Sequence, residues 1–188
     1  GEAAAAAETE KTDLIIFGLH DDYYALYGSE VTEILPYEPI TFVPGCPDEI
    51  IGIINVRGDI ESVLDLHRVL GLDPGEPTRK SRIIIAVGNG IRSGILVDRV
   101  EDVISVPVAD IKRPISTLDR TIRRYAVGGE TLYGNQYVTI LDAGKLFAGQ
   151  VDTLLVDRGE TRMGARGGRR WVHPPCASHP GGVGSVGV

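Results

Sequence analysis

The sequence predicts a mainly β domain that is built from two similar halves and has few, short helices. Three observations indicate this fold class. Short runs rich in Ile and Val recur along the chain, turn-forming residues separate them, and several runs occur twice in the same order. Strand-rich halves with tight hairpins suggest two small barrels.

The predicted strands are the apolar runs that Gly, Pro, Asp and Asn separate, and they cover residues 14–19, 23–27, 50–56, 60–66, 82–87, 91–97 and 136–141. Turns are expected where residues tolerant of positive φ lie between two runs, at residues 20–22, 57–59, 88–90 and 134–135. Short helices are predicted at residues 28–34, 66–70 and 143–147. These elements describe an order of hairpins, each half closing with a helix.

The internal repeat is the strongest sign of organisation. A shift of 69 positions carries Leu14-Ile-Ile onto Ile83-Ile-Ile, and Val31-Thr-Glu-Ile-Leu onto Val100-Glu-Asp-Val-Ile. A shift of 77 carries Val63-Leu-Asp onto Ile140-Leu-Asp. Because several elements match in order, a duplication is favoured over chance similarity between apolar strands.

The domain boundaries follow from composition. Residues 1–13 are rich in Ala and Glu without an apolar stripe, and residues 151–188 are rich in Gly, Arg and Pro, so both segments are expected to be disordered. The domain is expected over residues 14–150, with subdomains at roughly 14–80 and 81–150 and with possible exchange of strands between them.

Charge and hydropathy restrict the kind of partner. The net charge of −7 argues against nucleic acid, since phosphate binding requires a basic face. No apolar run approaches the roughly 20 residues that span a bilayer, so direct membrane insertion is not expected. No segment resembles a secretory leader, which favours a cytoplasmic location.

The sequence shows no catalytic constellation and no metal site. His20 lies in a predicted turn, where a solvated role is expected, and His67 opens a short helix and is expected to be partly exposed. The tail contains His173, Cys176 and His179, but nothing upstream offers a preorganised further ligand. We therefore expect no catalytic residue, no metal and no cofactor.

The segment Gly52–Ile60 is the most informative one for function. An apolar strand runs into Asn55 and Arg57 and then turns at Gly58. Asn55 could simply fix the hairpin, with Arg57 as an ordinary surface residue. Alternatively, the strand end presents a planar guanidinium beside apolar positions, which suits a protein interface. Spacing alone leaves both interpretations open.

Several segments together resemble CheW, the coupling protein of bacterial chemosensory arrays. They cover nearly all of residues 14–148 in the family's order, and they are Val31-Thr-Glu-Ile-Leu, Ile40-Thr-Phe-Val-Pro-Gly-Cys-Pro, Ile51-Gly-Ile-Ile-Asn-Val-Arg-Gly, Val63-Leu-Asp-Leu, Gly94-Ile-Leu-Val-Asp-Arg-Val and Ile140-Leu-Asp-Ala-Gly-Lys-Leu. The resemblance implies two five-stranded SH3-like β-barrels around a shared apolar core.

The resemblance also implies a function. CheW-like proteins bridge the cytoplasmic tip of methyl-accepting chemoreceptors to the histidine kinase CheA, without catalytic activity or cofactor. One barrel docks on the regulatory domain of the kinase, and the groove between barrels receives the receptor's helical hairpin. A cytoplasmic location at membrane-bound receptor arrays follows.

Site residues are carried over by position. The positions that match family residues linked to receptor or kinase coupling are Val31, Glu33, Gly52, Asn55, Val56 and Arg57. From the second barrel, the groove is expected to be lined by Val97, Asp98 and Val100. The sequence departs from the family at Asp59-Ile-Glu-Ser, where an apolar residue and Pro often follow the Arg-Gly turn, and this implies a change at the kinase-docking edge.

Two alternatives remain. The same fold could serve an accessory CheW-like adaptor in pili, development or second-messenger output. A small β-barrel that binds a small molecule would need a closed pocket with convergent polar groups, and the sequence offers little support for one.

Overall fold

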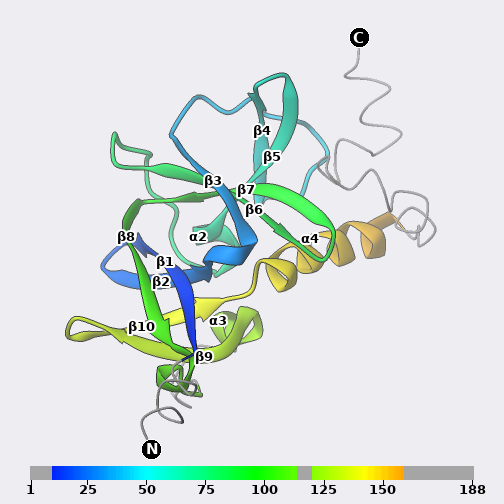
Figure 1. Cartoon of the computed structure of the whole chain (residues 1–188). Helices are drawn as coiled ribbons and strands as arrows, with labels where there is room; N and C mark the ends of the chain where they lie inside the picture. The colour runs from blue at the N-terminus through cyan, green and yellow to red at the C-terminus, as the bar shows by residue number, and fades with distance from the viewer. Residues whose placement is uncertain (1–9, 114–119, 159–188) are drawn as a thin grey trace, which may run out of the picture.

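The computed structural model describes residues 10–113 and 120–158, and it contains two five-stranded sheets (Figure 1). Sheet A has the strand order β8-β1-β2-β10-β9. Its strands are β1 (Lys11–Leu19), β2 (Asp22–Tyr27), β8 (Arg99–Pro107), β9 (Ala126–Tyr133) and β10 (Gln136–Leu141).

Sheet B has the strand order β3-β6-β7-β5-β4. Its strands are β3 (Val31–Pro36), β4 (Ile50–Val56), β5 (Asp59–Asp65), β6 (Arg82–Gly88) and β7 (Ile91–Val97). In each sheet one pair is parallel, β2 with β10 and β7 with β5, and the other pairs are antiparallel. The predicted fold class, a mainly β protein with two five-stranded units, is confirmed.

The duplication is visible in the strand register. In sheet A the pairing of β1 with β8 shifts by one residue between Ile16↔Asp102 and Phe17↔Val100. In sheet B the pairing of β6 with β3 shifts at the positions 69 residues away, between Ile85↔Glu33 and Ala86↔Val31. A bulge at the same place in both sheets is a specific local feature and not a general property of apolar strands.

The division between the halves differs from the expected one. Residues 31–97 form the whole of sheet B, whereas sheet A combines residues 11–27 with residues 99–141. The expected subdomains, 14–80 and 81–150, therefore do not match the sheets. The strand order explains the difference: the hairpins β1–β2 and β6–β7 have exchanged places, so that each pairs with the last three strands of the other half.

The expected ends of the domain also shift. β1 begins at Lys11, inside the segment 1–13 that was expected to be disordered, and the helix α4 (Ala143–Arg158) continues past residue 150. The rest of both terminal segments lies outside the described residues.

The helices connect and cover the sheets. They are the 3-10 turns η1 (Gly28–Glu30) and η2 (Val108–Asp110) and the α-helices α2 (Leu66–Val69), α3 (Arg120–Tyr125) and α4. α2 follows β5, and α4 follows the equivalent strand β10 and packs against β6 and β7 of the other sheet (Figure 1). Along the described part of the chain, no helix is long and apolar enough to cross a lipid bilayer.

The main hydrophobic core joins the two sheets. It contains Phe17 and Leu26 of sheet A, Ile84 and Ile95 of sheet B, and Phe147 of α4, all 2% exposed or less. Two smaller clusters fill the individual sheets. Because burial of apolar side chains is the dominant favourable term in folding, the shared core fixes how the sheets pack on each other.

Candidate protein interface

The β4–β5 turn is built to present Arg57. The side chain of Asn55 accepts a hydrogen bond of 2.8 Å from the backbone N–H of Gly58. Arg57 and Gly58 have φ angles of 51° and 91°, so two consecutive residues are left-handed. Asn55 thus fixes the hairpin, and the Arg57 side chain, which is 70% exposed, projects from it.

Arg57 forms an ion pair with Glu33 of β3. β3 and β4 are the two edge strands of sheet B, so this contact joins its opposite edges and shows that the sheet curves round into a barrel. The hydrogen bond from Arg57 lowers the pKa of the Glu33 carboxyl. The pair therefore stays charged at neutral pH and places a fixed guanidinium beside a carboxylate at the surface.

Gly52 of β4 accommodates the chain's own backbone. Its φ is 151°, and a Cβ there would lie 2.2 Å from the carbonyl oxygen of Thr41. Thr41 and Ile53 exchange two backbone hydrogen bonds of 2.9 Å. Residues 40–41 of the chain itself thus make the close approach to Gly52, and the glycine is required by the fold.

The four valines among the predicted site residues differ in accessibility. Val56 and Val97 are buried, at 6% and 0% exposure, so their side chains do not reach the surface. Val31 is half-buried and packs against the shared core. Val56 and Val97 can therefore affect a partner only by supporting their neighbours.

Val100 lies at a hollow between the two sheets. The hollow is lined by Lys80 and Arg82 at the start of β6 and by Arg99, Val100 and Glu101 at the start of β8. Val100 also packs against the shared core. This is the place where the structure provides a concave, largely cationic surface between the sheets.

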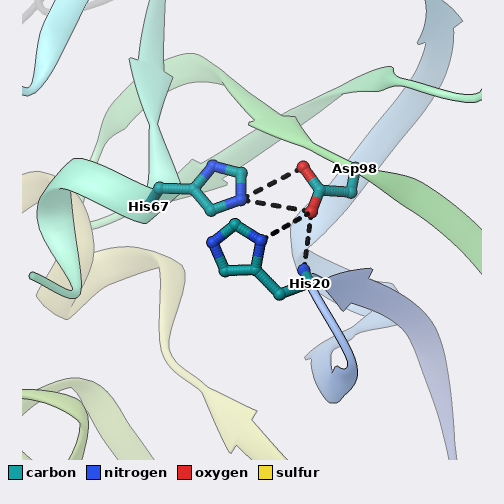
Figure 2. A group of neighbouring side chains, drawn as sticks. All are labelled: His20, His67 and Asp98. Carbon is teal, nitrogen blue, oxygen red and sulfur yellow. Dashed lines mark hydrogen bonds and ion pairs between the residues drawn. The ribbon is translucent and has the colours of Figure 1, made fainter. Parts of the chain in front are cut away.

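Asp98 faces two histidines. It lies between β7 and β8, and its carboxylate contacts Nε2 of His67 at 3.1 Å and the backbone N–H of His20 at 2.6 Å (Figure 2). His67 was expected to be partly exposed, and this is wrong, because it is only 3% exposed. Nothing in the sequence signals the cluster, since its members come from three separate segments that only the packing of the sheets brings together.

Asp65 supports His67 from the other side. Its carboxylate lies 3.2 Å from Nδ1 of His67 and caps α2 by accepting from the His67 backbone N–H. The hydrogen bond to Asp65 raises the pKa of His67, against burial, and Asp98 adds to this effect. Burial alone would raise the pKa of Asp65, but its contacts with His67 lower it.

The segment that departs from the family pattern is largely internal. Glu61 and Ser62 of β5 are each 2% exposed. Glu61 accepts a hydrogen bond of 2.7 Å from Nε of Arg92, and Ser62 contacts Ser93 at 2.7 Å. The two polar residues therefore join β5 to β7 and do not present a new docking edge.

Comparison with known proteins decides the family. A family model for the CheW-like domain matches residues 13–151. The chain belongs to the CheW-like domain family. The chemotaxis protein CheW of Klebsiella aerogenes is 31% identical over 153 residues, which cover 81% of this chain and 90% of that protein. A probable CheW of Rhizobium etli is 29% identical over 136 residues, covering 72% and 87%.

A solved structure agrees with the sequence matches. The scaffolding protein TtCheW of Thermoanaerobacter tengcongensis superposes with a TM-score of 0.66 at 30% identity, covering 73% of this chain and 93% of that one. The predicted resemblance to CheW and the predicted class of function, a chemotaxis coupling scaffold, are confirmed. Nothing in the comparisons favours an accessory adaptor or a small-molecule-binding barrel.

Proposed function

We propose that the chain holds methyl-accepting chemoreceptors and the histidine kinase CheA in one complex, on the cytoplasmic side of the membrane. It acts by non-covalent contact alone, without catalysis or a cofactor. Membership of the CheW-like family and the two-barrel fold support this proposal. The contact residues are those that remain accessible among the predicted set: Val31, Glu33, Asn55, Arg57, Asp98 and Val100.

The observation that carries the proposal is the presentation of Arg57. A guanidinium on a flexible side chain loses conformational freedom when it binds, and a rigid hairpin and an ion-pair partner reduce that loss. The fork of Arg57 can reach a carboxylate or a helix C-terminal carbonyl while Glu33 still contacts one of its nitrogens. Arg57 and Glu33 together are therefore the proposed anchor for one partner.

The hollow beside Val100 is the proposed seat of the other partner. A helical hairpin that offers an apolar stripe flanked by acidic residues would match an apolar base with Arg82 and Arg99 around it. The two surfaces lie on different parts of the fold, one at the β4–β5 turn and one between the sheets. One chain can thus contact two partners at the same time.

The test is a binding and kinase assay with purified receptor fragment and CheA. Arg57→Glu reverses the charge at the anchor and places two carboxylates together, so we expect loss of one of the two pairwise interactions and of receptor-controlled kinase activity. Lys11→Glu makes the same charge change at an exposed position on sheet A and is expected to keep both.

A charge exchange separates folding from recognition. In Arg57→Glu combined with Glu33→Arg, the ion pair can form again in the opposite direction, so the barrel edges remain joined. We expect this variant to unfold like the original chain and yet to couple poorly, because the partner now meets a carboxylate. Full coupling by the exchanged variant, or by Arg57→Glu, would show that Arg57 is not part of the interface.

A further inference from the structure

A cluster of two histidines and one aspartate lies where the two sheets meet, and neither the family function nor the proposed interface explains it. His20 comes from the β1–β2 turn of sheet A, His67 from α2, which follows sheet B, and Asp98 from the connection between β7 and β8 (Figure 2). One ligand atom from each side chain lies within 4.8 Å of the other two.

The outward nitrogen of each histidine is already engaged. Nε2 of His20 lies 2.7 Å from the backbone carbonyl oxygen of Asp73, which can only accept, so this nitrogen carries the proton. Nδ1 of His67 lies 3.2 Å from the carboxylate of Asp65 and is the donor there for the same reason. A metal-binding histidine characteristically donates its second N–H to a carboxylate or a backbone carbonyl.

The inward nitrogens both face Asp98. Nε2 of His67 lies 3.1 Å from one carboxylate oxygen, and Nδ1 of His20 lies 4.0 Å from the other. With the outward nitrogens protonated, neutral rings point two lone pairs at one carboxylate. The two lone pairs and the carboxylate can therefore share one cation placed between them.

We propose that His20, His67 and Asp98 bind a divalent transition-metal ion, zinc being the expected one. Two imidazole nitrogens and a carboxylate oxygen form a common three-ligand set for zinc, with a fourth position left for water or another ligand. His20 is half exposed, so the ion can enter from solvent and the ring can turn to shorten its distance to the ion.

Neighbouring charges are compatible with a cation at this place. Nε of Arg68 lies 3.4 Å from the carboxylate oxygen of Asp65 that does not contact His67, and Nε of Arg99 lies 2.9 Å from the carboxylate of Glu101. The guanidinium of Arg99 also donates to the backbone oxygen of His20. Both arginines are thus engaged with acceptors, and Asp98 keeps both oxygens toward the histidines.

Metal binding would connect the two barrels. Because the ligands come from both sheets and from the chain that crosses between them, an ion would oppose any change in their relative position. It would also stabilise the folded chain by mass action. The proposal does not depend on the coupling function, although Asp98 is shared with the proposed receptor groove.

The test is zinc titration of the full chain by calorimetry, with the same chain carrying His173→Ala and His179→Ala as the reference, so that the tail histidines cannot contribute. We expect one equivalent of zinc to bind the reference chain and to shift the imidazole resonances of His20 and His67. The thermal unfolding midpoint should rise with zinc concentration.

Two conservative variants locate the ligands without removing buried His67. His20→Asn copies Asn89 at the equivalent turn of the other sheet, and Asn tolerates the left-handed backbone of that position, where φ is 53°. Asp98→Asn keeps the shape of the side chain. Each is expected to weaken zinc binding at least tenfold, whereas Asn89→Gly, in the matching turn, is expected to leave it unchanged.

Three outcomes would overturn the proposal. The first is no zinc binding by the reference chain at a large excess of zinc. The second is binding by the unmodified chain that disappears when the tail histidines are replaced. The third is binding that neither His20→Asn nor Asp98→Asn weakens.

Discussion

Sheets A and B allow a direct comparison, because the duplication gives each strand of one sheet an equivalent strand in the other. Gly52 in sheet B corresponds to Gly129 in sheet A, 77 positions later, and both have positive φ, at 151° and 125°. Each glycine precedes a residue that forms an isolated bridge to a connecting segment, Ile53 to Thr41 and Glu130 to Lys112. Features that let a sheet fold have thus been kept in both halves.

Surface features have diverged. The β4–β5 turn of sheet B carries Asn55 and Arg57, whereas the corresponding hairpin of sheet A exposes Leu132 and Tyr137, at 54% and 58%. Leu132 and Tyr137 are cross-strand partners, so they form one apolar face. The two hairpins therefore offer different chemistry, charged on one sheet and apolar on the other, to whatever binds them.

Interior polar groups have diverged as well. Sheet B contains the buried Glu61 paired with Arg92, and the counterparts in sheet A are Val138 and Tyr23, which pack together in an apolar cluster. The same frame thus accepts an ion pair or an apolar pair at one place. The comparison teaches that the two sheets share their backbone, which depends on the equivalent glycines and on the strand register, whereas the side chains at equivalent positions can differ.

The largest expected effect comes from breaking the shared frame. Gly52→Ala and Gly129→Ala each place a Cβ against a backbone carbonyl, 2.2 Å from Thr41 and 1.3 Å from Lys112, in a backbone conformation that costs about 1–3 kcal/mol for a residue other than Gly. With the displaced bridge added, we expect a loss of at least about 3 kcal/mol in the free energy of unfolding for either variant.

Urea denaturation measures this loss, and Gly134→Ala is the matched control. Gly134 also has positive φ, at 62°, but its Cβ would meet open space. Only the left-handed penalty of about 1–2 kcal/mol then applies. If Gly52→Ala and Gly134→Ala lower the free energy of unfolding by the same amount, the close approach of a backbone carbonyl is not the reason for the glycine at position 52.

The second effect concerns the buried ion pair. Arg92→Ala leaves the carboxylate of Glu61 buried without its cation, and we expect a loss of about 3 kcal/mol. Copying sheet A with Glu61→Val and Arg92→Tyr together replaces the pair by apolar groups. Such replacements are often neutral or stabilising, so the double variant is expected to recover most of that loss.

The same denaturation measurement compares Arg92→Ala with the double variant. A double variant as unstable as Arg92→Ala would show that sheet B, unlike sheet A, requires a polar pair at this place. That result would limit the equivalence of the sheets to their backbones.

The sequence was sufficient for the fold class because the frame has a local signature. Buried runs such as Ile83-Ile-Ile lie between turn residues, and their repetition identified equivalent strands. β8 was not predicted as a strand, since residues 101–103 along it are exposed and give no apolar run. A helix was predicted over residues 28–34, and this is wrong for most of that range, because residues 31–36 form β3, which pairs with β6. The exchange of the hairpins β1–β2 and β6–β7 between the sheets depends on pairing across long sequence separations.

The interface residues near Arg57 could be predicted because they form one continuous segment. Asn55 and Arg57 lie in a single turn, so their geometry follows from local sequence. The cluster of His20, His67 and Asp98 could not, because its members meet only through the packing of two sheets. The burial of His67 follows from that packing as well, and a residue at the start of a short helix gives no local sign of it.

The smallest of the three effects distinguishes Glu30 from its counterpart Arg99, 69 positions later. Burial raises the pKa of the Glu30 carboxyl to about 7, with a further contribution from Asp142 and an opposing hydrogen bond from the N–H of Ala143. Since the folded-state pKa lies above the usual value of 4.5, this group stabilises the protein below about pH 4.5 and loses that contribution as pH rises through 7.

Glu30→Gln removes this titration and keeps the shape of the side chain. Between pH 5 and pH 8 the free energy of unfolding of the original chain should fall as Glu30 ionises, and the variant should lack this fall. Since Glu30 is only half-buried and solvent screens its charge, we expect the difference between the two chains to be on the order of 1 kcal/mol. Urea midpoints at the two pH values measure the difference, and Glu101→Gln, an exposed carboxylate on β8, serves as the control. Parallel pH profiles for the original chain and Glu30→Gln would show that folding does not raise the pKa of Glu30 into this range, which would contradict the expectation.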